Sequence, residues 1–202
     1  PVIQREIARK CVLAGKPVIV ATHLLESMID NVMPTRAEVS DIANAVYEEA
    51  DAVMLSGETA TGKHPVRCVE VLDKIVRRIE KEDAIGFSAL RQPAATREEL
   101  APALVVFTRR GILGQMVASF RPRRAIIYAF TNMSTTRRKL WLNRSVVPFR
   151  MNFSSDPEKT VVAALSKLRS RSRVLPGDQI VVISDIAAGD DRVAGVQVRV
   201  AE

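Results

Sequence analysis

Long apolar runs, a signal peptide and an initiator methionine are all absent from this 202-residue sequence. Because it has no run of about 18 apolar residues, we expect no transmembrane helix and no membrane partner. The N-terminus lacks the basic, apolar and small-residue succession of a signal peptide. Pro1 is instead followed by VIQREIARKCVLAG, which is typical of a helix already under way. We therefore expect a fragment or a processed chain.

Cysteine is also scarce, with only Cys11 and Cys68 in the chain. Neither has a nearby Cys or His at metal-ligand spacing, which disfavours a zinc site. We expect two buried thiols rather than a disulfide, and hence a reducing compartment such as the cytoplasm. The 47% hydrophobic and 26% charged residues are typical of a soluble globular protein, with room for one large domain or two small ones.

Positive charge is concentrated in the second half of the chain. Residues 1–90 hold 11 Lys/Arg and 14 Asp/Glu, a net charge of −3, whereas residues 91–202 hold 19 and 9, a net charge of +10. This asymmetry indicates an anionic partner for the second half, such as a phosphate, a nucleic acid or an acidic protein. A solvated basic surface explains the same pattern equally well.

Apolar periodicity predicts alternating helices and strands over residues 1–82. We expect helices at 2–14, 24–30, 34–50 and 64–82, and buried strands at 17–22 and 50–56. This alternation favours a parallel sheet with helical crossovers, since strands covered on both faces are almost continuously apolar.

Residues 83–102 are rich in Gly, Pro, Ala and charge, which indicates a linker. Beyond it we expect strands at 103–108, 125–130, 179–184 and 195–200, and helices at 111–120, 134–143 and 157–169. The predicted organisation is a first domain over 1–86, a linker over 87–102 and a second α/β domain over 103–202, with a mostly parallel sheet.

Thr22 ends the strand 17–22, where chemistry collects in parallel α/β folds. Its hydroxyl can hold a substrate carboxylate or relay a proton. The other interpretation is a cap for a helix that starts near Leu24, and the residues alone favour it.

Two further polar motifs lie in the first half. PTRAEVSDIANAV (34–46) carries Arg36, Glu38, Asp41 and Asn44 on one helix, as a solvated face or a polar subunit interface; the residues alone favour the solvated face. MLSGETATGKHP (54–65) has Gly and Lys before a helix, but its glycine spacing and Pro65 exclude a P-loop.

Four strings of the first half, in this order and spacing, resemble the end of the pyruvate kinase barrel: GKPVIVAT, LLESMI, PTRAEVSDIANAV and DAVMLSGETATGKHP. VVFTRRG, ASFRPRRAIIYAFTN and PGDQIVVIS resemble that family's C-terminal domain. The resemblance covers nearly the whole chain. It implies the last elements of a (β/α)8 barrel, with 17–22 and 52–56 as strands seven and eight, followed by a C-terminal α/β domain.

The resemblance implies glycolytic phosphoryl transfer from phosphoenolpyruvate to ADP, giving pyruvate and ATP, with Mg²⁺ (or Mn²⁺) and K⁺. Positioned cations carry most of such a reaction. The family's metal ligands, catalytic lysine and substrate arginine all precede this segment, so the chain alone is expected to be inactive. The family also forms homotetramers, in which residues 34–46 would meet another subunit.

By resemblance, Thr22 matches the threonine that borders the phosphoenolpyruvate site and takes part in enolate protonation. His23 stands where the family commonly has Gln. A histidine can titrate near neutral pH, but a packing or interface role is favoured for this one.

The family's C-terminal domain often binds a phosphorylated effector. Thr108, Arg109, Arg110 and Gly111 lie between a predicted strand and a helix N-terminus, where backbone N–H groups and the helix dipole favour an anion. In the family's bisphosphate-binding members this loop is rich in Ser and Gly, whereas this chain has arginine and large apolar residues. This disfavours a bisphosphate and leaves a monophosphate, such as a sugar phosphate or AMP, as the alternative. The loop 184–195 could close over the same site, although its Asp190 and Asp191 would weaken anion binding there.

The segment 130–148 places Arg137, Arg138, Lys139 and Arg144 around Trp141. RNA stacking is one interpretation, but a single aromatic disfavours nucleic acid. We favour a helix with one basic face and with Leu140, Trp141 and Val146 inside.

Compared with the family, the passage from Phe87 to Ala103 is short, and a helix that covers one face of the second sheet is expected to be missing. The basic second half and the Thr108–Gly111 loop suggest an alternative to an enzyme fragment: a non-catalytic phosphometabolite-binding regulatory module derived from the same fold.

Overall fold

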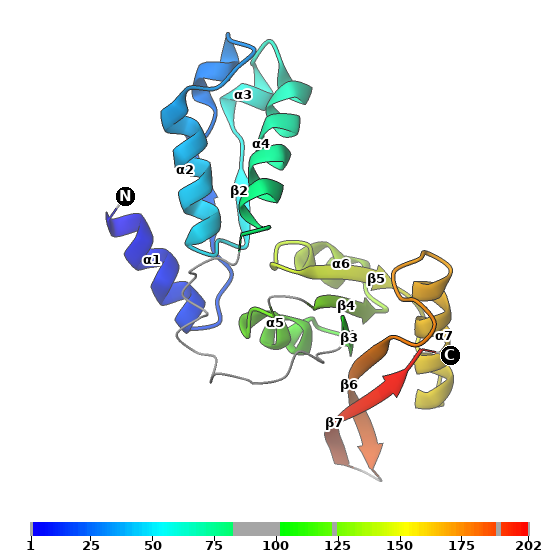
Figure 1. Ribbon diagram of the computed structural model, residues 1–202. Helices are drawn as coiled ribbons and strands as arrows, with labels where there is room; N and C mark the ends of the chain where they lie inside the picture. The colour runs from blue at the N-terminus through cyan, green and yellow to red at the C-terminus, as the bar shows by residue number, and fades with distance from the viewer. Residues whose placement is uncertain (1, 83–101, 123–124, 189–190, 202) are drawn as a thin grey trace. The chain divides into compact units, whose positions relative to one another are not determined.

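A computed structural model describes residues 2–82, 102–122, 125–188 and 191–201 (Figure 1). The chain forms two compact units, Pro1–Pro93 and Ala94–Glu202. The predicted linker 87–102 lies outside the described residues except for Pro102, and so does the passage in which a helix was expected to be missing.

The first unit alternates helices and short strands, as expected for the last part of a parallel α/β barrel. Its elements are α1 (Val2–Leu13), β1 (Ile19–Ala21), the 3₁₀ helix η1 (Glu26–Ile29), α2 (Arg36–Tyr47), β2 (Ala52–Met54), α3 (Gly57–Ala60) and α4 (Pro65–Ile79). β1 and β2 pair in parallel, with Val20 opposite Val53. Both strands are three residues long, shorter than the sequence predicted.

The core of the first unit forms where α2 and α4 pack over the strands (Figure 1). Its buried residues are Val20, Leu24, Leu25, Met28, Ile42, Ala45, Cys68 and Val71. α2 begins at a capping box, because the Thr35 side chain accepts from the Glu38 N–H while the Glu38 carboxylate accepts from the Thr35 N–H. α4 begins with Pro65 at its first turn, where the missing N–H costs nothing.

The second unit is built on a five-stranded sheet of order β5-β4-β3-β6-β7, parallel except for β7. The elements are β3 (Ala103–Phe107), α5 (Ile112–Ser119), β4 (Ile126–Thr131), α6 (Ser134–Leu140), β5 (Val146–Arg150), α7 (Pro157–Arg169), β6 (Gln179–Ala188) and β7 (Asp191–Val200). Helix α7 packs on one face of the sheet through Val161, Ala164 and Leu168. Helices α5 and α6 pack on the other face.

An aromatic ladder crosses three strands on the α7 face. Phe107, Phe130 and Phe149 are register partners on β3, β4 and β5. The Phe130 ring stacks on Phe107 at 5.6 Å and on Phe149 at 5.3 Å between centroids. Phe130 is fully buried, so this ladder forms the centre of the core.

The sheet has two unlike edges. β5 carries Pro148 opposite Ala129 of β4, and proline has no N–H to donate. β7 carries Val196, Val198 and Val200, which are all exposed and which alternate with half-buried residues. Strand β7 therefore presents an apolar row to solvent at the opposite edge.

Three predictions for the second unit were wrong. The strand β5 was not expected, and it contains Pro148, which an edge strand tolerates. The predicted loop 184–195 belongs largely to β6 and β7, which pair from Gln179↔Val200 to Ala188↔Asp191. Leu140 and Val146 are buried as expected, but Trp141 is 56% exposed because it follows the last residue of α6.

Candidate functional site

The first candidate site lies where β1 ends. Thr22 and His23 follow Ala21 directly, and both have left-handed backbone conformations, with φ of 67° and 55°. The Thr22 hydroxyl donates to the Ala21 carbonyl at 2.6 Å and is exposed. Thr22 does not cap η1. The N-cap residue of η1 is Leu25, and no side chain makes a capping hydrogen bond there.

His23 is exposed, and its Nδ1 contacts the Glu26 carboxylate one turn later. The hydrogen bond with Glu26, supported by the charge of the same carboxylate, raises the pKa of His23. The His23 imidazole thus forms a local ion pair with Glu26 at the surface of this unit.

The turn after β1 is attached to the rest of the unit by Glu58, a carboxylate from α3 that is 2% exposed. Its Oε1 accepts from the Leu25 N–H at 3.2 Å, and its Oε2 accepts from the Ser56 N–H at 2.8 Å. Leu25 follows β1 and Ser56 follows β2, so one side chain connects the carboxyl ends of both strands.

Glu38 forms a second attachment from α2 and is also buried. It accepts from the Ser27 N–H at 2.7 Å and the Thr35 N–H at 2.7 Å, and from both hydroxyls. Burial acts to raise the pKa of Glu38, but the hydrogen bonds from Ser27 and Thr35 outweigh it and lower the pKa. Arg36, Asp41 and Asn44 are exposed, so Glu38 is the exception to the solvated face expected for 34–46.

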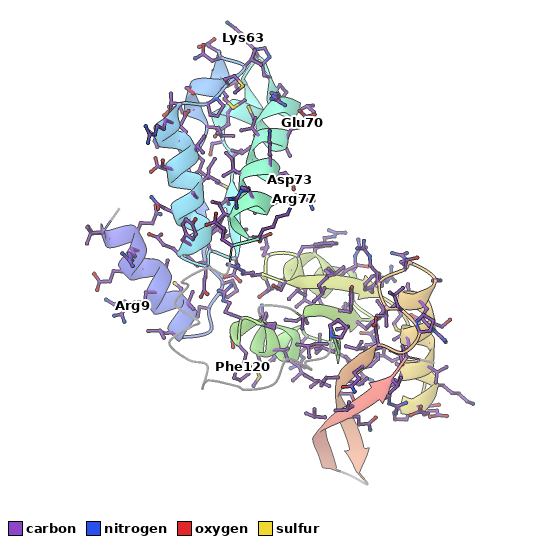
Figure 2. The ribbon with its side chains drawn as sticks, viewed as in Figure 1. Arg9, Lys63, Glu70, Asp73, Arg77 and Phe120 are labelled. Carbon is purple, nitrogen blue, oxygen red and sulfur yellow. The ribbon has the colours of Figure 1, made fainter. Side chains whose placement is uncertain are left out.

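The segment 54–65 does not resemble a phosphate-binding loop in structure either. The Lys63 ammonium pairs with Asp30 at 2.8 Å, and both side chains are exposed. Figure 2 labels Lys63 at the periphery of the first unit. A side-chain hydrogen bond and the charge of Asp30 raise the pKa of Lys63. The Lys63 ammonium is therefore engaged by an exposed carboxylate beside η1 rather than by an open anion site.

The second candidate site is a cavity of about 810 Å³ in the second unit, at the carboxyl end of β3. Its lining residues are Phe107, Thr108, Arg109, Arg110, Ile112, Leu113, Met116, Phe153, Ser154, Pro157, Thr160, Val161 and Ser184. Three of the four residues expected to bind an effector therefore lie in one cavity wall. From the predicted closing loop 184–195, Ser184 lines this cavity.

The fourth predicted residue, Gly111, shapes the loop. It has φ of +90°, and an added Cβ would lie 3.2 Å from Thr136 Cγ2. The Gly111 N–H donates to the buried Thr108 hydroxyl at 3.0 Å, and the Thr136 and Thr131 hydroxyls donate to the Arg109 carbonyl. These contacts fix the backbone, whereas the Arg109 and Arg110 side chains are exposed to solvent.

Neither Cys11 nor Cys68 forms a disulfide. Within residues 2–82, 102–122, 125–188 and 191–201, no group of three or more His, Cys, Asp or Glu could hold a metal ion. No helix in that same part of the chain is long and apolar enough to cross a membrane.

Comparison with known proteins decides the family. A sequence model of the pyruvate kinase barrel domain matches residues 1–69, and one of the pyruvate kinase alpha/beta domain matches residues 88–194. The chain belongs to the pyruvate kinase family. This agrees with the fold expected from the resemblance: the end of a barrel followed by an α/β domain with a mostly parallel sheet.

The relatives that this chain matches are much longer than the chain itself. Pyruvate kinase isozyme G, chloroplastic, of Nicotiana tabacum is 41% identical over 198 residues, covering 91% of this chain and 35% of that protein. Pyruvate kinase of Dictyostelium discoideum is 35% identical over 209 residues, covering 93% and 41%. The structure of Cryptosporidium parvum pyruvate kinase in complex with ADP matches with a TM-score of 0.84 and 27% identity, over 100% of this chain and 44% of that one. The chain thus spans less than half the length of each of these pyruvate kinases.

The sequence predicted Thr22 and the Thr108–Gly111 loop as candidate site residues but did not predict that Glu58 contacts the turn after β1. The string SGETA contains Glu58 just after a strand end, and that position was its only signal. The amino-acid sequence does not show that this carboxylate is buried and accepts hydrogen bonds from two backbone N–H groups.

Proposed function

We propose that this chain forms the C-terminal part of a pyruvate kinase, which transfers a phosphoryl group from phosphoenolpyruvate to ADP and produces pyruvate and ATP in glycolysis. The observation that carries the proposal is the match of both domains of the family, in order, along one chain. The catalytic lysine, the substrate arginine and the ligands for Mg²⁺ (or Mn²⁺) and K⁺ would come from residues outside this chain. When bound, the divalent cation would neutralise charge on the phosphoryl oxygens.

Within this function, we assign Thr22 to the proton-transfer step. Loss of the phosphoryl group leaves the enolate of pyruvate, whose C3 carbon must take up a proton. A threonine hydroxyl can deliver that proton and recover one from solvent. The position of Thr22 at the carboxyl end of a barrel strand supports this role, because active sites of such barrels lie on that face.

A pair of assays tests the proposal. The 202-residue chain alone should show no pyruvate formation in a lactate dehydrogenase-coupled assay. A chimera in which this chain replaces the matching segment of the tobacco isozyme G should show turnover dependent on phosphoenolpyruvate, ADP and Mg²⁺. Robust turnover by the chain alone, or none by a folded chimera, would contradict the proposal.

Substitutions in the chimera test the role of Thr22. Thr22→Ala should lower kcat by about 100-fold, the lower end of what a general acid contributes, whereas Thr22→Ser should retain most activity. Thr61→Ala is the matched control, since the Thr61 hydroxyl is exposed and donates to the Gly57 carbonyl. Full activity of Thr22→Ala would remove Thr22 from the mechanism.

The second unit supports a further candidate function, the binding of a phosphorylated effector, either for regulation of the enzyme or as a stand-alone regulatory module. The cavity at the start of α5 carries two exposed arginines beside a helix N-terminus. An anion is favoured there. Arg110, Ile112 and Leu113 occupy positions that are small and polar in bisphosphate-binding members, which favours a monophosphate such as a sugar phosphate or AMP.

Thermal shift measurements on the chain test this candidate. Sugar phosphates and nucleotides should raise the melting temperature, and Arg109→Ala with Arg110→Ala should abolish the effect. Arg137→Ala with Arg138→Ala removes the same charge from α6 as a control, since neither residue lines the cavity. An RNA titration in parallel should show no steep salt dependence. No stabilisation by any phosphate would remove the effector site.

We also propose a homo-oligomer, a tetramer as in the family, located in the cytoplasm. Two free thiols support a reducing compartment. The tobacco relative is a chloroplastic isozyme, so the compartment needs a direct test. Light scattering of the chimera and cell fractionation of the natural protein test the two statements separately.

A further inference from the structure

The turn after β1 holds two consecutive non-glycine residues in the left-handed region, Thr22 and His23. Each such residue costs roughly 1–2 kcal/mol relative to ordinary backbone. Strained backbone of this kind persists only where its surroundings over-determine it. The groups that hold this turn are therefore as important for the direction of the Thr22 hydroxyl as Thr22 itself.

Glu58 holds the turn at Leu25, three residues beyond Thr22, and holds the end of β2 at Ser56 with its other oxygen. Glu38 holds the same segment further on, at Ser27. The two attachments differ in what they connect: Glu38 joins the turn to α2, whereas Glu58 joins the carboxyl ends of the two strands. β1 and β2 pair directly as far as Ala21 and Met54. Glu58 extends this connection beyond the paired residues, because it joins the segment after β1 to the segment after β2.

The environment of Glu58 keeps it in this arrangement. The Cys68 thiol lies near the Glu58 backbone carbonyl, with its sulfur 3.6 Å from that oxygen. Burial, and next the charge of Glu58, raise the pKa of Cys68, so the thiol stays protonated as a donor. A side chain that is 2% exposed and bonded through both carboxylate oxygens has little freedom to move.

We propose that Glu58 is a positioning residue for proton transfer by Thr22, which it serves by fixing the strained turn against the end of β2. This inference rests on the proposed role of Thr22. The requirement for a carboxylate is specific, because both partners are N–H donors. Glutamine offers one accepting oxygen and an NH₂ that can only donate. Aspartate is one methylene shorter, so its two carboxylate oxygens cannot reach both the Leu25 and the Ser56 N–H groups unless the backbone moves.

The first test uses the 202-residue chain and needs no activity. In the unsubstituted chain, the Leu25 and Ser56 amides should be strongly protected from hydrogen exchange. Glu58→Gln should accelerate exchange at one of the two amides by roughly 10-fold or more and shift the resonances of Thr22 and His23. Glu70→Gln on the exposed side of α4 (Figure 2) is the control and should leave all four unchanged.

The second test uses the active chimera. Glu58→Gln should lower kcat roughly 10- to 100-fold while KM for phosphoenolpyruvate changes less than about 2-fold, as expected for a misplaced group rather than lost binding. The rate at which pyruvate exchanges its methyl protons with D₂O should fall by a similar factor. A purely structural loss would instead reduce kcat in proportion to the folded fraction, which circular dichroism measures.

The outcomes separate this inference from the proposed function. If Thr22→Ala abolishes proton exchange but Glu58→Gln does not change it, the function stands and the positioning role is overturned. If Thr22→Ala has no effect, the proposed role of Thr22 fails whatever Glu58 does. If Glu58 variants do not fold, unprotected Leu25 or Ser56 amides in the unsubstituted chain would still overturn the inference.

Discussion

Replacement of Phe130 by alanine should destabilise the second unit more than any surface change. Phe130 is the middle ring of the ladder and is fully buried between Phe107 and Phe149. Truncation of a buried Phe to Ala typically costs about 3–5 kcal/mol. Loss of two stacked pairs, each worth roughly 0.5–1.5 kcal/mol, places the expected cost near the upper end of that range.

The single tryptophan of the chain provides the assay. Trp141 lies at the end of α6 in the second unit, so its fluorescence during urea denaturation reports this unit. With an m-value of about 1.5 kcal/mol/M, a loss of about 4.5 kcal/mol lowers the urea midpoint by roughly 3 M. Phe120→Ala is the control, because Phe120 is 74% exposed at the end of α5 (Figure 2). A cost for Phe130→Ala below about 1 kcal/mol, or equal to that of the control, would refute the reasoning from packing.

Three smaller predictions follow from single side chains. Because the folded-state pKa of Glu38 is lowered, its stabilisation is present at neutral pH and is lost as the pH falls through that pKa; Glu38→Gln should therefore flatten the acid limb of a plot of unfolding free energy against pH. Gly111→Ala should cost about 1–2 kcal/mol by urea denaturation, since φ is +90° and the new Cβ meets Thr136; no change would contradict the left-handed conformation. Lys63→Ala should leave the thermal midpoint unchanged within error, because its ion pair with Asp30 is exposed, and a clear drop would show that the pair is structural.

Periodicity predicted most elements because apolar residues on helices and buried strands repeat regularly. It failed at β5, where Pro148 breaks the apolar run that an edge strand can nevertheless tolerate. It also failed at residues 184–195, where Gly, Ala and Asp are typical of a loop but the hairpin continues through the ladder of β6 and β7. In both places, long-range pairing overrides the local preference.

Some residues of the candidate sites could be predicted from the sequence, and others could not. Thr22 and the loop 108–111 stand at strand ends, and such positions can be located from the sequence once the strands are known. The burial of Glu38 and Glu58 could not be predicted, because carboxylates are usually exposed and only the folded backbone supplies the N–H groups that compensate their desolvation.

The two edges of the second sheet differ in how well they could pair with an added strand. At β5, Pro148 removes a donor that an added strand could use. At β7, the exposed row of Val196, Val198 and Val200 leaves an apolar surface beside the outermost backbone. A strand from another sheet of the same kind would therefore add at β7, and the outer edges of the joined pair would both be β5. Open-ended stacking of such sheets through both edges is therefore disfavoured, because only one of the two edges offers a complete set of backbone donors.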